Sequence, residues 1–307
     1  MRVFVVGGTG TIGRATVGTL QAAGQEVVCF GRRGLEGAVF RAGDVMNTAS
    51  VLADGFQGEW FDAVISCLAS RTGVPADAWA IDHGANLAVL EAAKRAGVTH
   101  FVLLSAICVQ KPLLAFQRAK LAFEEALAGS GLRYSIVRPT AYFKSLSGQL
   151  ERLRRGKPFL MFGDGRQTAC KPISDDDLGR YLVGCLGDPA RWNRILPIGG
   201  PGPALTPREM GDSLFGLLEI APRFRTVPVR LLDLIVGILH AVGAREKAEL
   251  ARIGRYYATE SMLVWDPIAR HYSADATPET GEDTLGSFYR RLVAGEVCVD
   301  RGEHAVF

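Results

Sequence analysis

Residues 3–13 read Val-Phe-Val-Val-Gly-Gly-Thr-Gly-Thr-Ile-Gly, an apolar run that stops at a glycine-rich turn. Residues 3–6 are apolar and mostly β-branched, which is typical of a strand buried on both faces in a parallel sheet. Residues 14–24 then carry apolar side chains at helical spacing. Strand, glycine turn and helix in direct succession are the context of a dinucleotide-binding motif. The stretch therefore predicts a nucleotide site at the start of the chain.

Each glycine of this turn has a separate task in such a motif. Gly7 permits the tight turn, Gly10 lets the backbone approach a pyrophosphate, and Gly13 lets helix and strand pack closely. The pyrophosphate then faces the N-terminus of the helix, whose backbone N–H groups bind anions. We expect the cofactor to contact Gly7, Thr9, Gly10, Thr11, Ile12 and Gly13.

The second predicted strand, residues 26–30, is followed by two arginines and no acid. In a Rossmann unit an acid at this point favours the ribose 2′-hydroxyl of NAD, whereas an arginine accommodates the 2′-phosphate of NADP. Arg32 and Arg33 therefore predict NADPH as the cofactor. Two solvent-exposed loop arginines with no ligand are the alternative interpretation.

Strands and helices alternate through the rest of the first half. The strands are predicted at 38–42, 61–68, 100–104 and 134–137, and the helices at 77–97 and 116–128. This alternation indicates an α/β fold with a doubly wound parallel Rossmann sheet, whose ligand crevice lies at the carboxyl ends of the strands. The residues that follow the strands are accordingly predicted cofactor contacts: Asp44, Val45, Cys67, Leu68, Ala69, Ser105, Pro139 and Thr140.

The composition is that of an ordinary globular protein. Of the 307 residues, 48% are apolar and 22% charged, and the net charge of +3 gives no reason to expect nucleic acid as a partner. The six cysteines show no C-x-x-C spacing and the five histidines are scattered, so no metal site is predicted. With no signal peptide visible, we expect a cytoplasmic protein.

After residue 150 the alternation weakens, so we predict a Rossmann domain at 1–150 and a smaller mixed lobe on the substrate side at 151–307. Ser174 followed by three aspartates is typical of a helix N-cap with acids in its first turn rather than of a metal site. Thr206 and Pro207 likewise predict the start of a helix.

Residues 229–242, VRLLDLIVGILHAV, are almost continuously apolar. The segment is too short to cross a bilayer, which needs about 20 residues. We interpret it as a buried helix. The alternative is a helix that lines a pocket for a large apolar ligand or makes a peripheral contact with a membrane surface.

The order of elements resembles the short-chain dehydrogenase/reductase superfamily in its extended and atypical branches. Members carry a Ser and a Tyr-x-x-x-Lys pair, and this chain has Ser105 but reads Phe116-Gln-Arg-Ala-Lys120 at the second motif. The tyrosine of the superfamily donates a proton to a carbonyl oxygen, and Phe116 has none to give, so carbonyl chemistry is disfavoured. Two options remain: reduction of a carbon–carbon double bond, or cofactor sensing without turnover. Lys120 can still hold the nicotinamide ribose; a solvated lysine is the alternative.

A closer resemblance extends over nearly the full chain. The segments 109–120, 138–145, 171–174, 254–263 and 277–285 look like the corresponding stretches of the 3,8-divinyl chlorophyllide 8-vinyl reductases. The resemblance implies an NADPH-dependent enzyme of (bacterio)chlorophyll biosynthesis that reduces the 8-vinyl group of divinyl (proto)chlorophyllide to ethyl. Plant members carry a transit extension, and this chain begins at its first strand, so a bacterial, cytoplasmic enzyme is expected.

Such a substrate is a flat, apolar magnesium tetrapyrrole that needs a large hydrophobic cleft. Phe116, Tyr142 and Phe143 are the predicted substrate contacts, and Lys120 and Tyr142 the predicted catalytic residues. Hydride addition to the vinyl group leaves a negative charge that spreads into the macrocycle, so no oxyanion donor is required. The proton donor stays open among Tyr142, Lys120 and water. A non-catalytic NADP(H)-sensing protein and an atypical reductase of another conjugated substrate are the rival hypotheses.

Overall fold

The computed structural model describes residues 1–297, so Cys298 lies outside the described residues. It divides into two compact units. The first comprises Met1–Ser70, Pro75–Pro139 and Asp175–Pro197. The second comprises Arg71–Val74, Thr140–Ser174 and the residues from Ile198 onward. The units interleave along the chain, and a single boundary at residue 150 does not describe the return of Asp175–Pro197 to the first unit.

The first unit is built on a seven-stranded sheet in the order β3-β2-β1-β4-β5-β6-β8. All pairs from β3 to β6 are parallel, which confirms the predicted doubly wound sheet. The order reverses between β1 and β4, the point at which such sheets bind ligands. The strands are β1 Arg2–Val6, β2 Glu26–Gly31, β3 Val39–Ala42, β4 Ala63–Ser66, β5 His100–Leu104, β6 Arg133–Pro139 and β8 Arg194–Ile198.

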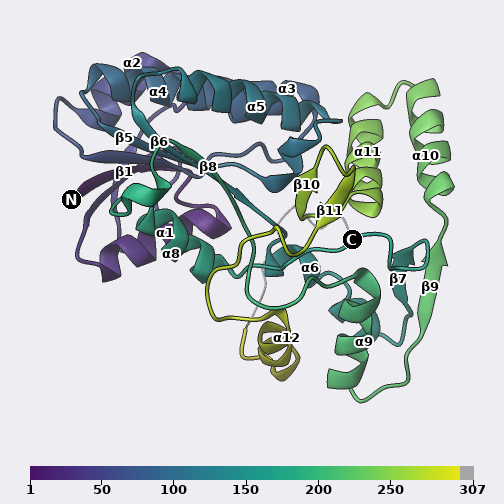
Figure 1. The fold of residues 1–307 in the computed structure, drawn as a ribbon. Coiled ribbons are helices and arrows are strands. Elements are labelled where there is room, and N and C mark those ends of the chain that lie inside the picture. Colours follow the sequence, from purple (N-terminus) through teal and green to yellow (C-terminus); the bar gives the residue numbers. More distant parts are fainter. Residues whose placement is uncertain (298–307) are drawn as a thin grey trace. The chain divides into compact units, whose positions relative to one another are not determined.

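Helices cover both faces of this sheet. Figure 1 shows α2, α4 and α5 on one face and α1 and α8 on the other. The helices of the unit are α1 Thr11–Ala22, α2 Thr48–Ser50, α3 Pro75–Ala78, α4 Asn86–Arg95, α5 Ala115–Ala128 and α8 Asp175–Gly184. The start of α8 at Asp175 agrees with the predicted cap, and its first turn carries the three aspartates.

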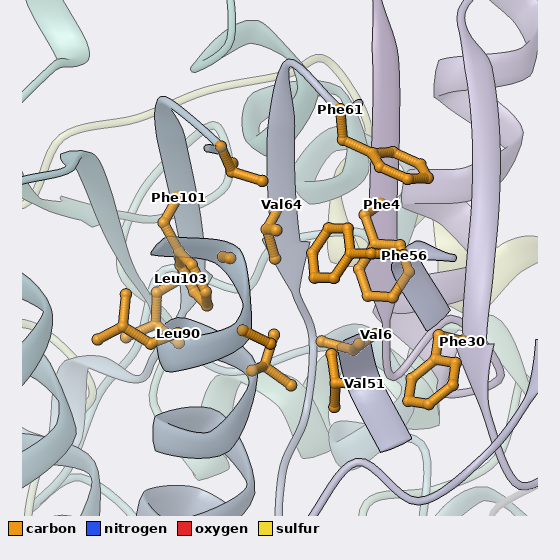
Figure 2. Close-up of a cluster of buried hydrophobic side chains, with 14 of the residues drawn as sticks. Phe4, Val6, Phe30, Val51, Phe56, Phe61, Val64, Leu90, Phe101 and Leu103 are labelled. Carbon is orange, nitrogen blue, oxygen red and sulfur yellow. The ribbon is translucent and has the colours of Figure 1, made fainter. Parts of the chain in front are cut away.

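An aromatic cluster packs on the central strands (Figure 2). The ring of Phe4 in β1 stacks on Phe56 at 4.3 Å between centroids and meets Phe61 edge-on at 5.3 Å. Phe30 in β2 joins the same cluster, and these side chains are at most 3% exposed. Rings packed in this way contribute specific contacts in addition to the apolar area they bury. The carboxyl ends of β1 and β2, where the glycine turn and the arginines follow, are therefore anchored to a rigid core.

The helix predicted at 77–97 is not a single regular α-helix. Between α3 and α4 the chain winds as a π-helix over Trp79–Ala85 (η2). The amide of Asn86 donates to the carbonyl oxygens of Ile81, at 3.3 Å, and Asp82, at 3.1 Å, and so replaces bonds that the backbone of an α-helix would make. Short π-helical stretches are frequent at functional sites.

The second unit contains small sheets and helices rather than a βαβ series. Its strands are β7 Phe159–Phe162 parallel to β9 Phe224–Val227, and β10 Val264–Asp266 antiparallel to β11 His271–Ser273. Its helices are α6 Phe143–Leu146, α7 Leu150–Arg154, α9 Pro207–Leu217, α10 Val229–Ala241, α11 Arg245–Thr259 and α12 Leu285–Ala294. The predicted cap of α9 is confirmed, because Thr206 and Glu209 form a reciprocal capping box with proline at the first helical position.

The interpretation of residues 229–242 as a buried helix is wrong. The segment forms α10, but no residue of this helix is buried, and Leu234 is 58% exposed. The helix packs against α11, where Asp233 pairs with Arg255. The apolar run supplies more apolar surface than one neighbouring helix can cover. Among residues 1–297 no helix combines the length and apolar character needed to cross a membrane.

Candidate functional site

The glycine turn closes tightly against the end of β4. Gly7 has a φ of +75°, a conformation that glycine adopts without strain. A Cβ placed on Gly7 would lie 2.5 Å from the carbonyl carbon of Cys67 and 2.8 Å from the amide nitrogen of Leu68. Only a residue without a side chain allows this approach. The predicted contacts Cys67 and Leu68 are therefore brought to the turn at the switch point of the sheet.

Helix α1 starts where a bound anion would be stabilised. Gly10 is its N-cap and provides no side-chain hydrogen bond to the first turn, which also contains no acid. The amide nitrogen of Gly10 instead donates to the carbonyl oxygen of Gly7 at 3.1 Å. A Cβ on Gly13 would lie 2.2 Å from that same oxygen. The turn thus presents backbone N–H groups and the positive end of a helix dipole, which suit a pyrophosphate.

The cysteines at this end of the sheet are not nucleophiles. Burial raises the pKa of the Cys67 thiol to about 12 and that of the Cys29 thiol to about 11. The Thr16 hydroxyl lies 4.0 Å from the Cys67 sulfur. Both thiols therefore stay protonated at neutral pH, and their contribution is packing around the turn.

Arg32 and Arg33 are exposed directly after β2. The amide of Gly43 donates to the carbonyl oxygen of Gly31 at 3.0 Å, so the predicted contact Asp44 lies at the same edge of the sheet. Val45 packs against the hydrophobic core, whereas the Asp44 carboxylate accepts from the Met46 amide at 2.9 Å. Within residues 1–297 neither arginine forms an ion pair with a carboxylate, so both guanidinium groups are available to an anionic ligand.

Replacing both arginines by alanine is expected to weaken NADPH binding by about 10- to 100-fold, because charge-assisted bonds to a 2′-phosphate contribute roughly 1.5–3 kcal/mol. NADH lacks this phosphate, so its affinity for the same variant is the internal control and should change little. Titration of Arg32→Ala/Arg33→Ala with both cofactors measures the two affinities. Equal losses for NADPH and NADH would contradict the assignment.

Lys120 is held by a buried acid, Asp82, which is not among the predicted site residues. Its Nζ lies 2.9 Å from Oδ1 of Asp82, whose side chain is fully buried, while Lys120 itself is only 12% exposed. Ser70 donates to Asp82 twice, from its hydroxyl to Oδ2 at 2.6 Å and from its amide to Oδ1 at 3.2 Å. Lys120 is therefore not a freely solvated lysine. Ser70 follows the predicted contact Ala69, which is exposed, so the network starts at the carboxyl end of β4.

The same network ties the π-helix to the sheet. The Ser66 hydroxyl in β4 donates to Oδ1 of Asn86 at 2.5 Å, and Asn86 in turn donates to the backbone of Asp82. A signal for Asp82 was present in the sequence. It occupies a position that helical spacing assigns to a buried face, together with Ala78, Ala85 and Val89. A carboxylate at such a position needs a partner, since burying an unpaired charge is costly.

Ser105 and Phe116 do not reproduce the Ser–Tyr pair of the short-chain dehydrogenases. The Ser105 hydroxyl donates to the buried carboxylate of Glu124, which also accepts from the Arg138 guanidinium at 3.1 and 3.2 Å. This hydroxyl is thus engaged within the unit. Phe116 is mostly buried in the first turn of α5, one turn before Lys120. No hydroxyl stands at that position.

The remaining predicted residues lie at or beyond the end of β6. Pro139 closes the strand, and in the second unit the hydroxyl of buried Thr140 donates to the carbonyl oxygen of Lys171. Phe143 is 2% exposed and packs on Phe288 at 5.2 Å between ring centroids. Tyr142 is only half-buried. Of the two aromatic residues, Tyr142 offers the larger surface to a ligand.

The chain is similar to plant reductases over nearly its whole length. It is 46% identical over 333 residues to the divinyl chlorophyllide a 8-vinyl-reductase of Oryza sativa subsp. indica. The aligned region covers 99% of this chain and 82% of the relative. With the Arabidopsis thaliana protein of the same name it shares 46% identity over 321 residues, 95% of this chain and 77% of the relative. Residues 7–189 match the family described as NAD(P)H-binding.

Among solved structures, the chain resembles a UDP-glucose 4-epimerase from Thermotoga maritima, with a TM-score of 0.71 at 18% sequence identity. The similarity covers 96% of this chain and 98% of the epimerase. At this identity the similarity concerns the fold alone.

Proposed function

This chain belongs to the NAD(P)H-binding family and, within it, to the divinyl chlorophyllide a 8-vinyl-reductases, and on that premise we propose that it reduces the 8-vinyl group of a divinyl chlorophyllide to ethyl. The observation that carries this function is the 46% identity over 99% of the chain. NADPH, when bound, supplies the hydride.

The residues at the carboxyl edge of the sheet fit this cofactor. Gly7 and Gly13 have no room for a Cβ, and the backbone N–H groups of this turn are proposed to bind the pyrophosphate. Arg32 and Arg33 are proposed to bind the 2′-phosphate. Lys120, oriented by Asp82, is proposed to bind the nicotinamide ribose, since its ammonium group is paired on one side with a carboxylate and keeps further N–H donors.

The absence of a hydroxyl at Phe116 agrees with a vinyl substrate. Hydride addition to the terminal vinyl carbon leaves a negative charge that the conjugated macrocycle absorbs, and a proton then completes the ethyl group at the inner carbon. The site therefore needs no donor for an oxyanion. Tyr142, Lys120 and water stay the candidate proton donors, and Tyr142 is also a proposed substrate contact.

Phe116→Tyr is expected to give no gain in vinyl reduction, because the added hydroxyl has no oxyanion to stabilise. Phe116→Leu measures separately how much turnover depends on the ring at this mostly buried position. Turnover with divinyl chlorophyllide, measured for both variants and the wild type, checks the expectation. A large rate increase in Phe116→Tyr alone would mean that the reaction type is wrong.

The proposed activity is tested by incubating the purified protein with NADPH and divinyl chlorophyllide under anaerobic conditions. The expected product is heavier by two hydrogens and has a shifted blue absorption band. Conversion also excludes the NADP(H)-sensing hypothesis. A folded protein that binds NADPH but converts no soluble pigment would favour that sensor instead, and NADPH oxidation with only another conjugated substrate would favour a different reductase.

We also propose that the second unit contributes Tyr142 to the substrate contacts and makes a peripheral contact with a membrane. The exposed apolar surface of α10 supports the contact. A flat apolar pigment partitions into lipid, so an enzyme held at the lipid surface meets its substrate there.

A further inference from the structure

We propose that helix α10 is the docking element and that it lies on an anionic lipid surface. The inference rests on the peripheral contact proposed above, and it adds the face of α10 that docks, the orientation of the helix and the charge of the lipid. Three features of the second unit carry it: an uncovered apolar face, a local excess of basic residues, and the length of the helix.

The first feature is the exposed stripe, by which we mean Leu231, Leu234, Ile235, Ile238 and Val242. Counted from Leu231 their spacing is i, i+3, i+4, i+7 and i+11, which places all five side chains on one face of the helix. Each of them is between 37% and 70% exposed. A contiguous exposed apolar face on an otherwise ordinary protein marks an interaction surface.

The exposed stripe is not the face that α10 uses to fold. Leu232, Val236 and Leu239 are half-buried, and they follow each other at helical spacing on the side that packs against α11. The helix therefore has two apolar faces, and α11 covers one of them. The second face stays largely exposed within residues 1–297, so its apolar character indicates another partner.

The charges around α10 indicate an anionic partner. Residues 221–257 contain seven arginines or lysines and only three acids, although the formal net charge of the whole chain is just +3. Two of the acids are compensated, because Asp233 pairs with Arg255 and Glu249 with Arg252. Basic side chains without a carboxylate partner in the described chain remain at Arg225, Arg230, Arg245 and Lys247. An apolar stripe with such groups before and after it in the sequence matches an anionic headgroup layer.

The length of α10 sets its orientation. Its 13 residues are too few to cross a bilayer, which takes about 20. The helix would therefore lie parallel to the surface, with the exposed stripe in the boundary between headgroups and acyl chains and the basic residues among the headgroups.

Flotation of the full chain with lipid vesicles tests the proposal. Vesicles of phosphatidylcholine mixed with phosphatidylglycerol should bind the wild type. The partition coefficient for pure phosphatidylcholine vesicles should be lower by about fivefold for each basic residue at the surface. Leu234→Glu/Ile238→Glu should lower the partition coefficient at least about tenfold, because two large apolar side chains become charged. Ile268→Glu is the matched control, since Ile268 is 93% exposed and lies outside α10.

The same variants separate the proposal from its alternatives. The proposal would be overturned if Leu234→Glu/Ile238→Glu binds vesicles as well as the wild type does. It would also be overturned if the wild type does not bind anionic vesicles. A wild-type dimer that this variant converts to monomers, without vesicle binding, would make a second copy the occupant. A raised KM for detergent-solubilised pigment, again without vesicle binding, would make the stripe a substrate wall.

Turnover of detergent-solubilised pigment keeps this inference apart from the proposed activity. The stripe variant should retain that turnover while it loses vesicle binding. A wild type that binds anionic vesicles but converts no pigment would refute the activity and leave the docking surface standing.

Discussion

The Gly13→Ala variant should bind NADPH at least about 100-fold more weakly than the wild type and should unfold at a lower temperature. The new methyl group would lie 2.2 Å from the carbonyl oxygen of Gly7 and 2.8 Å from the Cα of Gly8. Both neighbours are backbone atoms, so no side-chain rotation relieves the clash. The turn has to open and α1 has to move away from β1, which displaces the N–H groups that face the pyrophosphate. Fluorescence titration with NADPH and a thermal melt measure the two effects.

Gly18→Ala is the matched control on the same helix. A Cβ on Gly18 meets no atom within 4 Å, so the substitution is expected to preserve NADPH affinity. It should raise the free energy of unfolding by up to about 1 kcal/mol, because alanine has the higher helix propensity. If Gly13→Ala and Gly18→Ala bind NADPH equally well, the tight turn is not the cofactor site.

Lys120→Ala should lower the free energy of unfolding by about 3 kcal/mol or more and impair NADPH use as well. The substitution leaves the fully buried carboxylate of Asp82 with the two hydrogen bonds from Ser70 but without a counter-charge. Asp82→Asn/Lys120→Met removes both charges and retains similar volumes. This double variant is expected to recover most of the lost stability, and to leave cofactor use impaired by at least about tenfold because the ammonium group is absent.

This difference between stability and cofactor use separates a structural from a functional role. Denaturant unfolding gives the stability of each variant, and steady-state kinetics with NADPH gives kcat and KM. Lys94→Ala serves as the control, since its exposed pair with Glu91 should contribute less than about 1 kcal/mol. A double variant with normal NADPH kinetics would make the pair purely structural. A fully stable Lys120→Ala would show that Asp82 does not need Lys120.

The sequence alone was enough to predict the sheet and the use of an NAD(P)H cofactor. Hydrophobic periodicity predicted the strands and the helix at residues 3–24. The glycines predicted the tight turn between them, because a glycine leaves space that a side chain would fill. Both are local properties that can be recognised in a short stretch. The NADPH preference was predicted from residues next to one another, Arg32 and Arg33. The substrate class came from the resemblance of whole segments, which no single residue would have provided.

The tertiary structure decided which element covers each helix face and which group pairs with each charged side chain. Lys120 was predicted as a cofactor residue, but its pairing with Asp82 depends on a π-helical turn that the alternation of apolar residues does not distinguish from an α-helix. The apolar run at 229–242 was predicted as a helix, but its burial was predicted wrongly. Periodicity shows that a helix has an apolar face, whereas the area of the neighbouring elements decides whether that face is covered. In α10 the neighbouring helix α11 covers one apolar face and leaves the other largely exposed. A pattern within one segment carries no information about the size of the surface that the segment will meet.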